Sequence, residues 1–276
     1  MDPIRLGLLA AGGAAATAAV ALLLTRRVTG KREAGTPIGP ALAAGFAAGF
    51  LLVEGLPKSL PREAHQWLLP ASLVGSAAGL FEGRREPPHP LLRWAVRLPL
   101  AAGLVWVTLL DRSGARAVVP AVVLLLTLAI LDGAARRGGP TFLLALGVAC
   151  AATAVCLGIS GSMTFGQHGG AIAAATGACF LLGPWIPVDP RSGVLVAGLV
   201  LAGLRLNARI YVDPPLPLAS ALLLAAAPLG ALFPNSWLGE KPRAWVALLA
   251  RTAAVAAIAG VAVGIAIHES PPTDGW

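Results

Sequence analysis

The chain has 276 residues, of which 57% are hydrophobic and only 12% are charged, and its mean hydropathy is +0.77. A soluble domain carries about 25% charged residues, so this composition excludes an ordinary soluble enzyme or binding domain. The net charge of +8 would suggest nucleic acid in a soluble protein. Here the basic residues lie between apolar segments, where they fix the orientation of a membrane protein, so we expect the lipid bilayer as a partner and no nucleic acid.

Ten apolar segments follow one another, most of them about 20 residues long, which is the length a helix needs to cross a bilayer. Their continuous apolar composition excludes the alternating pattern of a membrane barrel. The sequence therefore predicts an all-α, polytopic integral membrane helix bundle, with a single transmembrane domain over 1–268 and a short polar tail over 269–276. The expected helices cover 4–25, 38–56, 65–81, 91–111, 117–134, 140–159, 169–188, 192–211, 215–233 and 243–267.

The first segment is too long for a signal peptide, and Arg26 and Arg27 follow it directly, so we expect an uncleaved helix. If ten segments cross with the N-terminus outside, 13 basic residues lie inside and 7 outside, which favours both termini outside a cell membrane. The chain is rich in Ala, Gly and Arg and poor in Lys, which suggests a GC-rich bacterium and its inner membrane.

Glu54 lies near the end of the second segment, deeper in apolar sequence than most of the acidic residues. Carboxylates within membrane segments often bind protons or cations, so Glu54 is a candidate ion-pair or proton site. The alternative is an interfacial carboxylate paired with Lys58 four residues later.

The fourth segment is the least regular, because Arg93 and Arg97 share one helical face at a spacing of four. This face suits the headgroup region, and Pro99 marks a possible bend. Nine crossings are therefore the alternative to ten. In the fifth segment, Asp132 is expected to pair with Arg136 at the same spacing of four.

The junction between the sixth and seventh segments is rich in glycine and hydroxyl groups and carries no formal charge. Polar backbone at membrane depth is tolerated where protein or water satisfies it, so the junction is either a re-entrant turn lining a cavity or an external loop. In the first case it would bind a small solute through Ser160, Ser162, Thr164, Gln167 and His168.

Two further candidate sites contain arginine. Arg205 and Arg209 share a face of the eighth segment and, with Asn207, form a candidate anion-binding or lipid-binding site, because guanidinium matches phosphate. The alternative is that both arginines reach back to the interface. Arg251 lies about 12 Å into the last helix and is a second candidate for substrate binding, with Glu54 or Asp132 as a conceivable partner.

Small-residue pairs at a spacing of four occur at Gly45 and Gly49, Gly75 and Gly79, and Gly260 and Gly264. Such faces pack helices closely and can support a homo- or hetero-oligomer. The three cysteines, Cys150, Cys156 and Cys179, lie in apolar segments without metal-binding spacing and are expected to be buried hydrophobic residues. No catalytic, phosphate-binding or metal-binding motif is present, so we expect no cofactor and no metal, and a non-enzyme rather than an enzyme.

Three functions remain open from the sequence. The first is a permease-like transporter of a small solute, favoured by the ten segments and the polar junction. The second is a non-catalytic membrane scaffold or assembly subunit that uses the small-residue faces. The third is a membrane enzyme that acts on lipid phosphate through Arg205, Asn207 and Arg209.

Overall fold

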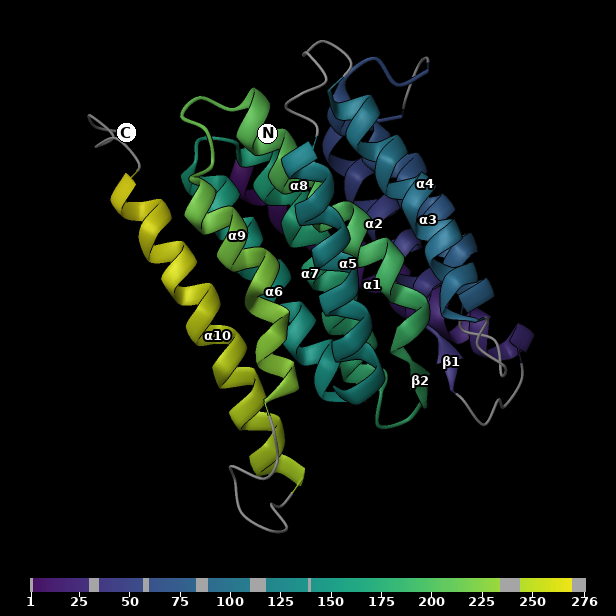
Figure 1. The fold of residues 1–276 in the computed structure, drawn as a ribbon. Helices are drawn as coiled ribbons and strands as arrows, with labels where there is room; N and C mark the ends of the chain where they lie inside the picture. The colour runs from purple at the N-terminus through teal and green to yellow at the C-terminus, as the bar shows by residue number, and fades with distance from the viewer. Residues whose placement is uncertain are drawn as a thin grey trace.

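The computed structural model describes residues 2–29, 35–56, 60–82, 89–109, 118–138, 140–233 and 244–269. Within these ranges the chain forms ten α-helices, so the all-α prediction is confirmed (Figure 1). The helices are α1 (Pro3–Thr29), α2 (Gly39–Glu54), α3 (Leu68–Glu82), α4 (Pro90–Thr108), α5 (Val118–Gly138), α6 (Pro140–Ile159), α7 (Met163–Leu182), α8 (Val194–Tyr211), α9 (Leu218–Ala226) and α10 (Ala244–Glu269). Short 3₁₀ helices are η1 (Ala64–Trp67), η3 (Pro190–Gly193) and η4 (Ala227–Leu232), and β1 (Thr36–Pro37) pairs in parallel with β2 (Val188–Asp189).

Successive helices run up and down through one bundle, and α1 begins at the same end at which α10 finishes (Figure 1). We call this the terminal end, and the opposite end, which carries β1 and β2, the strand end. Helices α1 and α7 run in the same direction. At the terminal end the Gln167 side chain donates a hydrogen bond to the Pro3 carbonyl at 2.8 Å, and at the strand end β1 pairs with β2.

Five helical segments are long and apolar enough to cross a membrane: Pro3–Thr29, Leu91–Thr108, Thr141–Ile159, Pro190–Tyr211 and Ala244–Glu269. The second of these lies within the irregular fourth segment, and α4 is one α-helix through Pro99. Helix α2 and the stretch Leu218–Leu232 are apolar but shorter. The membrane prediction is thus supported for five helices, while ten crossings are not established by length and composition.

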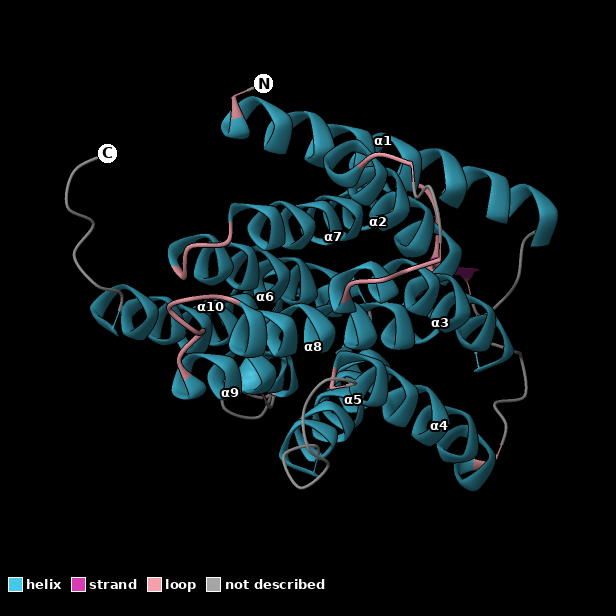
Figure 2. Cartoon of the chain, turned by 90° about the horizontal axis from the view of Figure 1, so that it is seen from above, coloured by secondary structure: helices cyan, strands magenta, loops and turns pink. Residues whose placement is uncertain are grey.

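Helix α8 lies in the middle of the bundle, and α1 and α10 lie at its edges (Figure 2). Thirteen of the eighteen residues of α8 are buried. In α1 only Ala10, Ala14, Ala18 and Leu22 are buried, one every four residues, while the exposed large apolar side chains are Ile4, Leu8, Leu9, Val20, Leu23, Leu24 and Val28. A helix with one packed face and an apolar outer face is expected where lipid replaces water.

Small residues let α1, α2 and α7 approach closely. A Cβ atom on Gly45 would lie 2.8 Å from the Ala14 carbonyl oxygen, and one on Gly49 would overlap the Cβ of Ala171. Two of the predicted small-residue pairs therefore pack inside the bundle, since Gly75 and Gly79 face α8 and η3 in the same way. By contrast, a Cβ atom added to Gly260 or Gly264 on α10 would meet no atom of another element within 4 Å.

Some predicted boundaries were wrong. Helix α7 begins at Met163 rather than 169, because the Ser162 hydroxyl accepts a hydrogen bond from the Phe165 amide and caps the helix. Two of the glycines that suggested a loop, Gly166 and Gly169, pack against α6 instead, and a Cβ on Gly169 would lie 2.8 Å from Ala154 Cα. The predicted helix over 215–233 is divided into α9 and η4 near Pro228, whose missing N–H interrupts an α-helix.

The start of α2 is held by a residue distant in sequence. The Ser192 hydroxyl accepts hydrogen bonds from the amides of Ile38 at 2.8 Å and Gly39 at 3.2 Å, and donates to the Asp189 carbonyl at 3.0 Å. The first amides of a helix have no partner within it, so Ser192 provides an acceptor for the Gly39 amide and adds to the 3.4 Å bond from the Ile38 amide to the Asp189 carbonyl. This contact ties α2 to η3 at the strand end.

Candidate functional site

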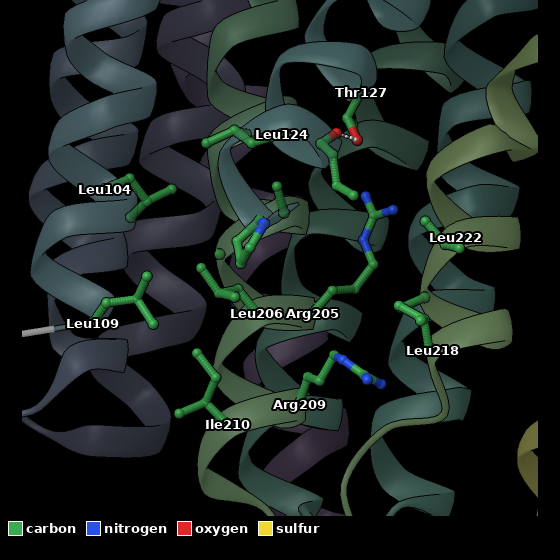
Figure 3. A pocket seen from close by; sticks show the side chains of 15 residues that line it. Leu104, Leu109, Leu124, Thr127, Arg205, Leu206, Arg209, Ile210, Leu218 and Leu222 are labelled. Atoms are coloured by element: carbon green, nitrogen blue, oxygen red, sulfur yellow. Dashed lines mark hydrogen bonds between the residues drawn. The ribbon is translucent and has the colours of Figure 1, made fainter. Parts of the chain in front are cut away.

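A pocket of about 570 Å³ lies between α4, α5, α8 and α9. Its wall is mostly apolar and includes Leu104 of α4, Leu124 of α5 and Leu222 of α9, and α8 contributes Arg205 and Arg209 (Figure 3). The volume falls within the range of roughly 300–1,000 Å³ that small-molecule sites occupy. Two basic groups in an apolar wall suit a ligand that has an anionic group and an apolar body.

Helix α8 places Arg205 and Arg209 on one face because they are four residues apart. The helix ends at Tyr211, so Arg205 lies about 9 Å below its terminal end and Arg209 about one turn closer to that end. Both side chains extend into the space between α8 and α9 (Figure 3). Arg209 is anchored by a hydrogen bond from its guanidinium to the Leu216 carbonyl at 3.0 Å.

Arg205 is only 5% exposed, and its Nε donates a hydrogen bond to the Leu201 carbonyl at 2.9 Å. Among the described residues no carboxylate forms an ion pair with it. A buried cation without a counter-charge is costly in an apolar surrounding. An anionic ligand in the pocket would supply that charge.

Asn207 is separated from the two arginines. It is buried, its side-chain amide donates to the Gly203 carbonyl at 2.8 Å, and it does not line the pocket. Two residues along a helix rotate a side chain by about 200°, so Asn207 lies on nearly the opposite face of α8 from Arg205. Its buried side-chain oxygen has no hydrogen-bond partner in the described structure.

The residues predicted at the junction lie around the first turn of α7, away from the pocket. Ser160 donates to the Cys156 carbonyl at 2.8 Å, Ser162 caps α7, and Gln167 reaches Pro3. Thr164 is half-buried on the same turn. Two members of this group are buried, Ser160 at 2% and His168 at 0% exposure.

Glu54 meets two histidines at the terminal end of the bundle. Its Oε1 lies 3.3 Å from His65 Nε2 and 3.7 Å from His168 Nε2. His65 Nδ1 lies 3.3 Å from Glu63 Oε2. The predicted partner Lys58 is outside the described residues. Glu54 and His168 were predicted as members of separate candidate sites, and no role was predicted for His65.

A buried ion-pair network joins α3, α4 and α5 near the strand end. Arg97 is 1% exposed and donates to Glu82 at 2.9 and 2.5 Å and to Asp132 at 2.9 Å. Arg93 lies 3.9 Å from Asp132, and the predicted pair of Arg136 with Asp132 is confirmed at 2.8 Å. The expectation that Arg93 and Arg97 face lipid headgroups is wrong, because Glu82 and Asp132 provide buried partners for them.

Arg251 lies near the strand end of α10. Its guanidinium donates to the Phe233 carbonyl and to the Thr141 hydroxyl, each at 3.3 Å. Neither Glu54 nor Asp132 pairs with it, and it does not line the pocket.

The three cysteines are free and buried, as predicted. Within the described ranges, no three His, Cys, Asp or Glu side chains are arranged to hold a metal ion. No protein-family model and no curated protein sequence matches this chain, so its function is argued from the geometry of its own residues.

Proposed function

We propose that the protein is a permease-like membrane protein that binds an amphiphilic anion in the pocket between α4, α5, α8 and α9. The single observation that carries this proposal is Arg205, a buried cation without a carboxylate partner in the described structure, in a wall of apolar side chains. Guanidinium binds phosphate and carboxylate strongly, and the leucine side chains suit an apolar chain.

The proposed topology has ten crossings with the terminal end outside the cell. The up-and-down order of the helices, the apolar outer surfaces of α1 and α10, and the excess of basic residues that the sequence predicts on the inner side support it. In this topology the pocket lies in the outer half of the bilayer, and Arg209 is nearer its mouth than Arg205.

The chemistry of the pocket favours binding and transfer over reaction. Among its described lining residues, Thr127 is the one side chain with a hydroxyl, and that hydroxyl donates to the Val123 carbonyl at 2.8 Å. No carboxylate, histidine or cysteine side chain lines the described wall, whereas general acid–base or nucleophilic catalysis needs such a group. A transporter is therefore the better proposal than a lipid-phosphate enzyme.

A scaffold is the second candidate function. The observation that favours it is the open face of α10 at Gly260 and Gly264, which is free for close helix contact. Replacing both glycines with leucine would then abolish cross-linking between copies or partners in native membranes. Unchanged cross-linking would refute this candidate.

The experiment that tests the pocket is a binding titration in nanodiscs of zwitterionic lipid. The probe is dodecyl phosphate. Dodecyltrimethylammonium has the same apolar tail with a cationic headgroup, and inorganic phosphate has the anionic headgroup without a tail. We expect Arg205→Met to weaken dodecyl phosphate binding by about 10- to 100-fold, because a charge-assisted hydrogen bond is worth about 1.5–3 kcal/mol.

Arg62→Met is the matched control, since Arg62 is an exposed arginine on the same side of the proposed membrane. The Arg62→Met variant should bind dodecyl phosphate with the same affinity as the unaltered protein. Equal affinities for Arg205→Met and Arg62→Met, or equal binding of the cationic amphiphile, would overturn the proposal.

A further inference from the structure

Four titratable side chains form a row at the terminal end of the bundle, apart from the pocket. Glu63 precedes η1, His65 lies on η1, Glu54 is the last residue of α2 and His168 lies on α7. The contacts alternate between carboxylate and imidazole, at 3.3, 3.3 and 3.7 Å. Three separate segments of the chain therefore bring carboxylates and imidazoles into one continuous series of side-chain contacts.

The row leads from the surface into the interior. The Glu63 side chain is 68% exposed, those of His65 and Glu54 are 13% and 25% exposed, and that of His168 is 0% exposed. Its outer end therefore exchanges protons with solvent, while its inner end lies among the packed helices.

His65 has the geometry of a proton carrier because each of its ring nitrogens faces a different carboxylate. Nδ1 lies beside Glu63 and Nε2 beside Glu54. An imidazole can accept a proton on one nitrogen while it releases a different proton from the other nitrogen. One proton is thereby transferred from one side of the ring to the other. Both of these N···O distances, 3.3 Å, exceed that of an ideal hydrogen bond by a few tenths of an ångström. Side-chain motion can shorten them, or one water can bridge the two groups.

His168 is the inner end of the row. Neither of its ring nitrogens has a hydrogen-bond partner in the described structure, although the side chain is fully buried. Buried polar groups are nearly always hydrogen-bonded, so this exception calls for an explanation. The ring stacks on Phe50 with centroids 4.7 Å apart.

We propose that Glu63, His65, Glu54 and His168 form a proton relay from the terminal end to the buried imidazole of His168. A proton from solvent binds Glu63 and passes to His65 Nδ1, and the Nε2 proton of His65 passes to Glu54 and then to His168 Nε2. The reverse sequence returns the proton to solvent, so every step moves one proton between an oxygen and a nitrogen.

The other elements packed against α7 carry further titratable or charged groups. These are Arg5, Arg26 and Arg27 on α1 with Asp2 just before it, Cys150 and Cys156 on α6, and Arg205 and Arg209 on α8. Among the described carboxylates, Glu54 is the one that pairs with His168. Glu54 is therefore the step through which the relay reaches the interior.

The test uses the full-length protein with ¹⁵N-labelled histidine in nanodiscs. The chain has only four histidines, so each ring can be followed by NMR. We expect Glu63→Gln to slow proton exchange between solvent and the His168 ring by at least about tenfold, because a missing acid–base group costs at least that much. Glu54→Gln should slow it further.

Glu269→Gln is the control, since Glu269 is an exposed acid at the same end of the bundle. It should leave the exchange rate unchanged. Glu63 is exposed, so its variant keeps the fold even if Glu54→Gln does not. An unchanged His168 exchange rate in Glu63→Gln would overturn the relay, and so would a rate change of equal size in Glu269→Gln.

Discussion

Replacing Arg97 with methionine should destabilise the protein more than any other single change in the network of α3, α4 and α5. The change removes three charge-assisted hydrogen bonds and leaves Glu82 buried without its guanidinium partner. Breaking a buried ion pair from one side costs about 3–5 kcal/mol. We therefore expect a loss of that size in the free energy of unfolding, measured by equilibrium denaturation in mixed detergent micelles.

Arg136→Met is a close control, because Arg136 pairs with the same carboxylate of Asp132 but is 41% exposed. An exposed pair at this helical spacing is worth about 0.3–0.5 kcal/mol. The double variant Arg97→Met with Glu82→Met should recover much of the loss, since apolar residues replace a buried pair at little cost. A loss for Arg97→Met no larger than that for Arg136→Met would refute the reasoning.

Three further predictions concern the fold and its orientation. Ser192→Ala removes the cap of α2 and should lower the free energy of unfolding by about 1–3 kcal/mol. Hydrogen exchange at the first amides of α2 should become faster, and an unchanged exchange rate would contradict this prediction. Gly49→Val should lower the stability measured by thermal denaturation by about 1–3 kcal/mol, because the added side chain overpacks the contact with α7. Gly264→Val, on an open face of α10, should lower it little, and equal losses for the two variants would refute this prediction. In sealed vesicles with the proposed orientation, R62C should react with a membrane-impermeant maleimide from outside and R136C only after permeabilisation; the opposite pattern would reverse the topology.

Features set by neighbours in sequence were predictable. Apolar composition and segment length predicted the helices, because a backbone in lipid must satisfy its own hydrogen bonds. The pair of Asp132 and Arg136 followed from helical spacing, and so did the shared face of Arg205 and Arg209. The burial of the three cysteines followed from their apolar surroundings.

Features that depend on distant contacts were not predictable. Nothing near Ile38 indicates that Ser192 caps its helix, and Glu82 looks like an ordinary residue at a helix end until α4 brings Arg97 beside it. The wall of the pocket comes from four helices, so only its arginines could be proposed from local spacing. His65 was missed because its importance depends on the position of α7, which the sequence does not specify.

If Arg205 holds an anionic amphiphile inside the bundle, native mass spectrometry of the protein released from cell membranes should detect that molecule. We expect a bound molecule with an acidic headgroup and an apolar chain on the unaltered protein and on Arg62→Met. The same molecule should be absent from Arg205→Met. An identical set of bound molecules on all three proteins, or no bound anion on any of them, would contradict the claim.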